Sequence, residues 1–140
     1  MSARIDMSLS NDVQEVARVI DTLEEFGAEH GVPVAQSLRF GLVLDELITN
    51  IISYGLAGRS DGRISLAIEH RDGVLRAELA DNGPPFDPLA ADATPPSGDI
   101  ETREVGGLGL TIVKSFMDRL DYRRVDGLNR LTMEMNVKAA

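Results

Sequence analysis

A glutamate and an asparagine stand four residues apart in an apolar run, Glu46-Leu-Ile-Thr-Asn50. In a helix this spacing puts both polar groups on one side, about a turn apart. An amide oxygen is a reasonable ligand for Mg²⁺, and a carboxylate one turn earlier could accept a proton from an attacking hydroxyl or water. The pair therefore suits metal-assisted phosphate chemistry, although the solvated face of an ordinary amphipathic helix can carry the same spacing.

A second polar motif, Asp81-Asn-Gly83-Pro-Pro-Phe-Asp87, follows an alternating run that ends at Leu79. It should lie where a strand ends and a loop begins. Asp81 can accept a hydrogen bond from an exocyclic amine such as adenine N6, and Gly83 lacks the Cβ that would keep a flat ring from the backbone. An ordinary turn uses the same residue types.

The third motif, Gly106-Gly-Leu-Gly-Leu110, runs into an apolar pattern that is typical of a helix. Free backbone N–H groups at such a helix start suit phosphates. Glycines can also simply ease the chain into a helix, because Gly-x-Gly segments are common. Taken together, the metal-and-base pair, the amine acceptor and the phosphate cradle predict an ATP site.

The order and spacing of the three motifs resemble the ATPase fold shared by gyrase B, one heat-shock chaperone family, histidine kinases and MutL. More narrowly, the chain is similar to the bacterial anti-sigma factor serine kinases, and the resemblance spans nearly its whole length. In that family a small protein binds ATP, sequesters a sigma factor and phosphorylates a serine on an antagonist of the STAS type. The segments that carry the resemblance are Glu46-Leu-Ile-Thr-Asn50, Tyr54-Gly55, Asp81-x-Gly-x-Pro-Phe-Asp-Pro88, Gly107-Leu-Gly-Leu-x-Ile-Val113 and Asn129-Arg-Leu-Thr132.

The resemblance implies a role for each matching residue of the first two motifs. It makes Glu46 the catalytic base, Asn50 the Mg²⁺ ligand and Asp81 the adenine contact, with Gly83 at the floor of the adenine pocket. Many relatives have His-Gly where this chain has Tyr54 and a glycine. That departure removes none of the expected catalytic groups.

The later motifs are implied to reach the phosphates and the base. Gly107, Gly109 and Leu110 would bring the lid and the helix start onto the nucleotide, and Arg103 is the candidate for a basic lid residue, although it also suits a solvated loop. Thr132 resembles the family's late-strand threonine near the base. The period-2 alternation of the strand nevertheless predicts that Thr132 lies on the sheet face opposite to the apolar residues of the same strand.

Residues 84–105 are rich in proline, alanine and aspartate, a composition that predicts a long loop. Loops of this length without secondary structure are usually lids, binding loops or disordered. Because the loop lies between two nucleotide motifs, we interpret it as a lid that orders with the γ-phosphate, rather than as an idle linker. Residues 1–140 are then a single ATP-binding kinase domain.

The hydrophobic periodicity predicts a two-layer α/β sandwich, with a mixed, mostly antiparallel sheet and helices on one face. Asp-Gly turns join two hairpins, and a helix separates these hairpins along the chain. The expected strands cover 5–9, 64–68, 75–79, 122–125 and 131–137, and the expected helices start near 13, contain 40–54 and cover 108–120.

Composition limits the function classes. The chain has 140 residues, no cysteine and a formal net charge of −9, which opposes nucleic-acid binding and would suit a basic protein partner. It shows neither a membrane-spanning run nor a secretory signal at its start, so we expect a cytoplasmic protein without a membrane partner. The resemblance adds a homodimer formed through the N-terminal strand and helix.

Three functions remain open at this point. The first is an ATP-dependent serine/threonine kinase that is also an anti-sigma factor. The second is a non-catalytic ATP-binding module that switches partners, binding a sigma factor or another regulator. The third is the catalytic piece of a histidine kinase, which fits less well because the sequence has no helical hairpin bearing a phosphoacceptor histidine.

Overall fold

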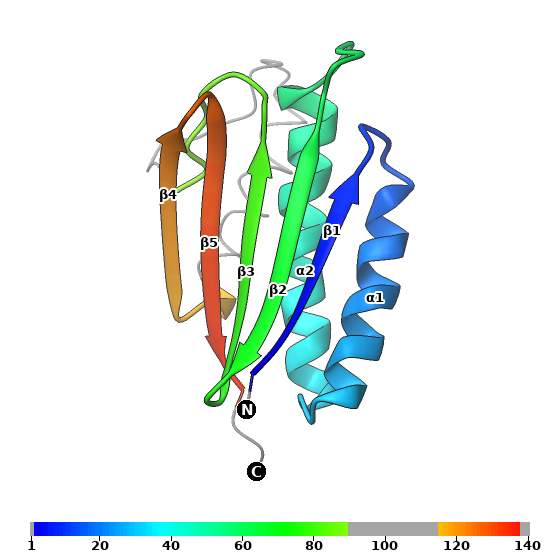
Figure 1. Ribbon diagram of the computed structural model, residues 1–140, viewed down its shortest axis with the longest axis vertical. Coiled ribbons are helices and arrows are strands. Elements are labelled where there is room, and N and C mark those ends of the chain that lie inside the picture. Colours follow the sequence, from blue (N-terminus) through cyan, green and yellow to red (C-terminus); the bar gives the residue numbers. More distant parts are fainter. Residues whose placement is uncertain (1, 90–114, 138–140) are drawn as a thin grey trace.

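The computed structural model describes residues 2–89 and 115–137. These residues form a five-stranded sheet in the order β1-β2-β3-β5-β4 (Figure 1). Every described pair of neighbouring strands is antiparallel, so the prediction of a mostly antiparallel sheet is confirmed and its mixed character is not seen. The strands are β1 (Ser2–Leu9), β2 (Ile64–Arg71), β3 (Val74–Asp81), β4 (Arg119–Val125) and β5 (Leu128–Asn136).

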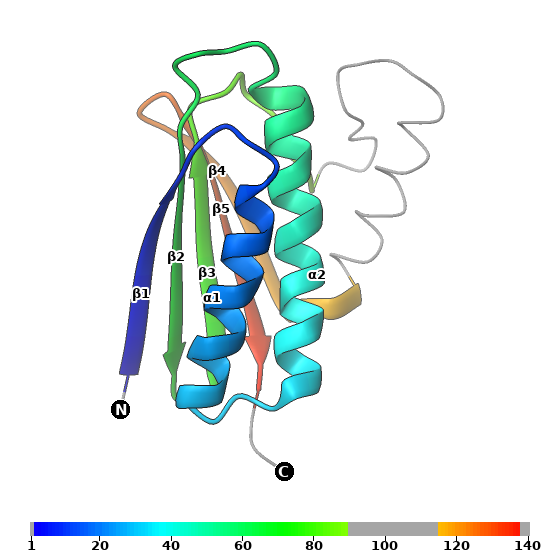
Figure 2. The same ribbon diagram turned by 90° about the vertical axis from the view of Figure 1, so that its right-hand side faces the viewer.

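Two helices, α1 (Glu15–Glu29) and α2 (Val34–Asn50), lie side by side on one face of this sheet (Figure 2). The arrangement confirms the predicted two-layer sandwich. Beyond α2 the chain continues without a break into η1 (Ile51–Gly55), a short π-helical segment. Among the described helices, none has the length and apolar character that crossing a membrane requires.

The core lies between the two layers because both layers present apolar side chains with the correct period. In β3, the alternating residues Leu75, Ala77 and Leu79 are buried, as period-2 alternation requires. In α2, Phe40 and Leu47 lie on the buried stripe of a 3.6-residue period. Burial of these faces against each other is the main favourable term for folding.

Both hairpin turns follow their Asp-Gly sequences. Asp72 and Gly73 have φ angles of 52° and 76°, and Asp126 and Gly127 have φ angles of 54° and 76°. Two successive positive φ angles match the right-handed twist of the flanking strands, and aspartate and glycine tolerate them best. The predicted hairpins β2–β3 and β4–β5 are therefore confirmed.

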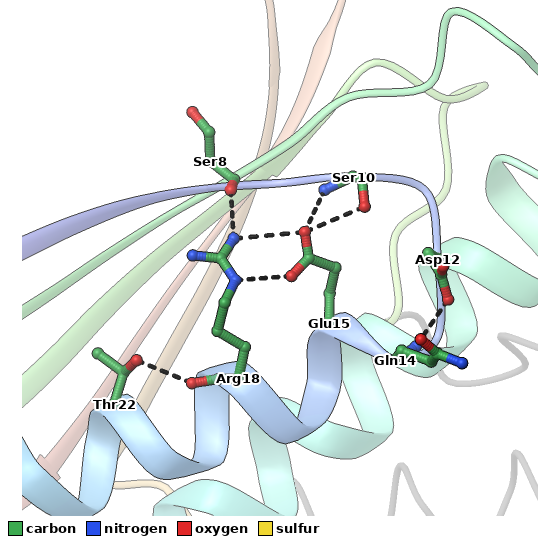
Figure 3. Close-up of polar contacts among 7 residues, drawn as sticks. All are labelled: Ser8, Ser10, Asp12, Gln14, Glu15, Arg18 and Thr22. Atoms are coloured by element: carbon green, nitrogen blue, oxygen red, sulfur yellow. Dashed lines mark hydrogen bonds and ion pairs between the residues drawn. The ribbon is translucent and has the colours of Figure 1, made fainter.

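A polar network joins the end of β1 to the start of α1 (Figure 3). Glu15 Oε1 accepts hydrogen bonds from the backbone N–H and the hydroxyl of Ser10, at 2.8 and 3.0 Å. Arg18 donates to Glu15 Oε2 at 2.7 Å and to the Ser8 carbonyl at 2.6 Å. Asp12 Oδ1 accepts a hydrogen bond from the Gln14 N–H at 2.9 Å. The Arg18 and Ser10 donors lower the pKa of Glu15 to about 2.

The helix predicted for 108–120 does not reach its expected end. Helical structure in its described part covers only Ser115 and Phe116, and β4 begins at Arg119. Leu120 therefore belongs to the sheet, where it pairs with Met133 of β5. The position of Leu120 fits both the helical spacing and the period-2 alternation of a strand. It joins the sheet because the edge of β5 is free to pair with it.

Candidate functional site

The last two turns of α2 place Glu46 and Asn50 next to each other. Asn50 Nδ2 donates a hydrogen bond to Glu46 Oε1 at 3.3 Å, so the two groups lie on one side of the helix, as the i, i+4 spacing predicted. Both side chains are partly buried. No described residue donates to the carbonyl oxygen Oδ1 of Asn50. The pair therefore presents an oxygen that remains available as a ligand.

The helix widens directly after Asn50. In η1, the Leu56 N–H bonds to the Ile51 carbonyl at 2.8 Å, five residues back. Single π-helical turns are rare in α-helices and occur frequently at functional sites. Here the wide turn brings Ile51, Tyr54 and Gly55 to the wall of the same pocket that Asn50 lines.

Burial is the largest influence on the Glu46 carboxyl, and it raises the pKa of Glu46 above its ordinary value. The hydrogen bond from Asn50 acts in the opposite direction, and the neighbouring charge of Asp45 adds to the increase. A carboxylate with a raised pKa is a better proton acceptor near neutral pH than an ordinary surface glutamate.

Asp81 ends β3 and is buried, with 6% of its surface exposed. Its Oδ1 accepts hydrogen bonds from the Gly83 N–H at 2.9 Å and from Asn129 Nδ2 at 3.1 Å. Its Oδ2 has no donor among the described residues. One oxygen is thus fixed by the protein, while the other remains available to a ligand.

Gly83 occupies a position that leaves no room for a side chain. A Cβ at this position would lie 2.9 Å from Asp81 Oδ1 and 3.1 Å from the carbonyl oxygen of Gly55. The loop after β3 therefore packs directly against the end of η1. Arg124 of β4 holds this loop in place, because its Nη1 donates to the Gly83 carbonyl at 2.7 Å.

Asn129 connects the strand end, the loop and β4. Its amide nitrogen donates to Asp81 Oδ1 and to the Pro84 carbonyl, the latter at 2.9 Å. Its amide oxygen accepts from the Tyr122 hydroxyl at 2.6 Å and from the Phe86 N–H at 3.2 Å. The sequence motifs predicted no role for Asn129 or Tyr122. The available signal was the phase of Asn129, which is a polar residue in the same alternation as the apolar residues of β5.

These groups surround one pocket between α2, η1 and the ends of β3 and β5. Asn50 and Asp81, 31 positions apart in the sequence, both line it, whereas Glu46 lies one turn outside the lining. Apolar and aromatic side chains make most of its wall. The lining residues are Leu47, Asn50, Ile51, Tyr54, Gly55, Leu79, Asp81, Pro84, Pro85, Phe86, Pro88, Tyr122, Asn129 and Leu131.

The structure does not bring Thr132 to this pocket. Thr132 lies on the other face of the sheet, in a shallow depression with Arg76 and Glu78, as its period-2 phase indicated. Of the predicted lid, residues 84–89 are described and contain neither helix nor strand. The expected phosphate-side residues lie outside the described residues: Arg103, Gly107, Gly109 and Leu110.

Comparison with known proteins relates this arrangement to ATPase domains. The sequence pattern of the histidine kinase-like ATPase domain matches residues 9–135. The serine/threonine-protein kinase BtrW of Bordetella bronchiseptica is 35% identical over 98 residues, which cover 69% of this chain and 69% of that protein. The anti-sigma F factor of Clostridium botulinum is 31% identical over 77 residues, which cover 55% of this chain and 54% of that protein.

A solved structure shows the same fold. The RsbU and RsbW domains of a Mycobacterium tuberculosis protein match 99% of this chain with a TM-score of 0.71 and 18% sequence identity. The match covers 33% of that longer chain. The sheet with two helices on one face is therefore the fold of known proteins, as the sequence motifs indicated.

Proposed function

Because the chain belongs to the histidine kinase-like ATPase domain family, we propose that it is an ATP-dependent serine/threonine protein kinase that acts as a cytoplasmic anti-sigma factor. In this proposal it phosphorylates a serine or threonine of a STAS-domain antagonist, binds a sigma factor and forms a homodimer. The names of its relatives, a serine/threonine-protein kinase and an anti-sigma factor, support this choice. The observation that carries it is the single pocket shared by Asn50 and Asp81, with Glu46 hydrogen-bonded to Asn50.

The pocket fits an adenine ring in shape and in hydrogen bonding. The apolar and aromatic wall, which includes Ile51, Leu79 and Phe86, suits a flat heterocycle. Asp81 Oδ2 is available to accept a hydrogen bond from an exocyclic amine. Gly83, which the resemblance implies for the floor of this pocket, does not line it among the described residues; the absence of its Cβ instead lets the loop pack against Asp81 and Gly55, which do line it.

The residues also fit Mg²⁺. Asn50 uses its amide nitrogen for Glu46, which turns its oxygen toward other partners, and an uncharged oxygen is a suitable ligand for this cation. Mg²⁺ usually keeps several waters and takes few protein ligands, because nucleotide phosphates supply the rest. When bound, the ion would neutralise charge on the phosphates.

In this proposal Glu46 acts as the base. Its carboxylate is held one turn from the Mg²⁺ ligand by the Asn50 hydrogen bond, and its raised pKa favours proton uptake from a serine or threonine hydroxyl. The hydroxyl oxygen then forms a bond to the γ-phosphorus, the bond to the β,γ-bridging oxygen breaks, and ADP leaves with that electron pair. The protein contributes chiefly by positioning the reactants.

The test is transfer of labelled γ-phosphate from Mg-ATP to the STAS-type protein encoded nearest to this chain. Wild type should label a serine or threonine, and Glu46→Ala should abolish labelling. Glu46→Gln, whose side-chain oxygen can still accept from Asn50 Nδ2, should also abolish labelling while nucleotide affinity, measured by calorimetry, stays unchanged. Glu25→Ala is the matched control, because Glu25 is an exposed acid of α1 that lines neither the nucleotide pocket nor the groove between α1 and α2. Tight ATP binding without transfer in the wild type would instead identify the non-catalytic partner switch.

A further inference from the structure

The outward face of α2 carries an apolar stripe that no described residue covers. Val34, Leu38 and Leu42 follow one another at four-residue spacing and are 75%, 54% and 54% exposed. Side chains at this spacing are neighbours on a helix surface. Scattered exposed leucines are ordinary, but a contiguous apolar stripe is a feature of interaction sites.

Leu38 and Leu42 form one wall of a groove between α1 and α2. The two helices run side by side along it (Figure 2), and Ile20 and Leu23 of α1 contribute its apolar base. Gly41 allows the close approach, because a Cβ there would lie 3.1 Å from Ile20 Cδ1. The groove thus has the shape and the surface that an amphipathic helix needs.

Both charged residues that line the groove are acidic. Glu24 stands on α1 and Asp45 on α2, and the described lining contains no basic residue. Arg39, the single basic residue of α2, does not belong to the lining. An apolar groove between two acidic groups selects a partner with apolar side chains flanked by Arg or Lys.

This charge pattern disfavours the other occupants. In a symmetric contact between two copies, Glu24 and Asp45 of one copy would face the same acids of the other, within chains of net charge −9. An anionic membrane surface or a nucleic acid would meet the same repulsion. A basic segment of another protein is the occupant that both the shape and the charge fit.

We propose that the α1–α2 groove binds an amphipathic helix of a protein partner, with apolar residues on one face and basic residues beside them. The groove shares no described residue with the nucleotide pocket, so a partner helix and a nucleotide can be bound at the same time. It ends close to that pocket, because Leu42 lies one turn before Glu46 on the same helix. A helix seated there would place its partner protein beside the proposed catalytic base.

The test uses three synthetic helical peptides, each about 15 residues long and therefore able to span the groove. They share one leucine face and carry lysine, glutamine or glutamate at the flanking positions. Fluorescence anisotropy with the full chain should show the lysine peptide binding about tenfold tighter than the glutamate peptide, with a preference that declines as salt rises. Equal affinities, or no binding of the lysine peptide, would overturn the proposal.

Two sets of variants locate the binding. Leu38→Asp combined with Leu42→Asp should weaken the lysine peptide by about tenfold or more, whereas Val13→Asp, at a residue that is 53% exposed outside the groove, should leave its affinity unchanged.

Glu24→Lys combined with Asp45→Lys changes exposed positions and should reverse the preference toward the glutamate peptide. Equal loss in the Val13 control, or no reversal, would contradict the assignment. Self-association in sedimentation velocity that the Leu38 and Leu42 changes abolish would identify a second copy as the occupant.

Discussion

Replacing Asp81 by asparagine should reverse the hydrogen-bonding character that the pocket presents to a base. Two donors, the Gly83 N–H and Asn129 Nδ2, already point at the Oδ1 position. In Asp81→Asn the amide oxygen must occupy that position, because an NH₂ group there would face both donors. The new NH₂ group therefore takes the place of Oδ2, and an acceptor becomes a donor.

The size of the effect follows from the bond that is lost. A hydrogen bond to a charged acceptor contributes about 1.5–3 kcal/mol, which corresponds to about 10- to 150-fold in affinity. The adenine amine would also face a second donor, which adds to the loss. The 6-oxo group of hypoxanthine is an acceptor, so Asp81→Asn should bind inosine nucleotides better than the wild type does.

Calorimetric titration with Mg-ADP and Mg-IDP measures both changes. Thermal unfolding should show that the variant is within about 1 kcal/mol of wild type, since both bonds to the Oδ1 position persist and a buried charge is removed. Asp6→Asn, at a side chain that is 68% exposed in β1, is the control for the change in net charge. ADP affinity within about twofold of wild type in a folded Asp81→Asn protein would refute the assignment of Asp81 to the base.

Three further predictions concern metal binding, proton transfer and stability. Asn50→Ala should weaken ATP binding measured with Mg²⁺ while leaving binding of adenosine unchanged, and equal losses for both ligands would contradict its role as the metal ligand. Glu46→Gln should abolish phosphate transfer and raise the free energy of unfolding by up to about 1 kcal/mol at neutral pH. Because burial raises the pKa of Glu46 above 4.5, the melting temperatures of Glu46→Gln and wild type should coincide below pH 4.5 and separate as the pH rises through the raised pKa. Arg18→Ala should lower the melting temperature by a few degrees at neutral pH. Arg18 is the largest of the influences that lower the pKa of Glu15 from 4.5 to about 2, so the difference should shrink as the pH falls below 4.5 and toward 2. A difference at pH 2 as large as that at neutral pH would exclude the ion pair as its cause.

Local chemistry made several parts of this protein predictable from its sequence. The Asp-Gly turns at 72–73 and 126–127 require two positive φ angles, and few other dipeptides supply them. The Glu46–Asn50 contact depends only on helical spacing. The position of Asp81 at a strand end follows from the alternation before it and the turn residues after it.

Tertiary pairing made other parts unpredictable. Leu120 fits both a helix and a strand by spacing, and only the edge offered by β5 decides between them. The widening of α2 into η1 has no signal in the sequence that distinguishes it from a continued α-helix. The partnership of Asp81 and Asn129 depends on the β3–β5 register, which spacing along the chain cannot reveal because 47 residues separate the two.

Asn129 shows how strand phase and strand register combine to define the site. Phase alone excludes Thr132 from the helix-covered face and admits Asn129, because the two differ by an odd number of positions. Register then places Asn129 directly opposite Asp81, where a side chain with both a donor and an acceptor can bond the carboxylate, the loop and Tyr122 together. A threonine at the same position could bond Asp81 but could not also reach all of these partners, since one hydroxyl offers a single donor. The amide therefore couples the proposed adenine acceptor to the loop after β3, where the proposed lid begins, so a displacement of Asp81 or of this loop should displace the other.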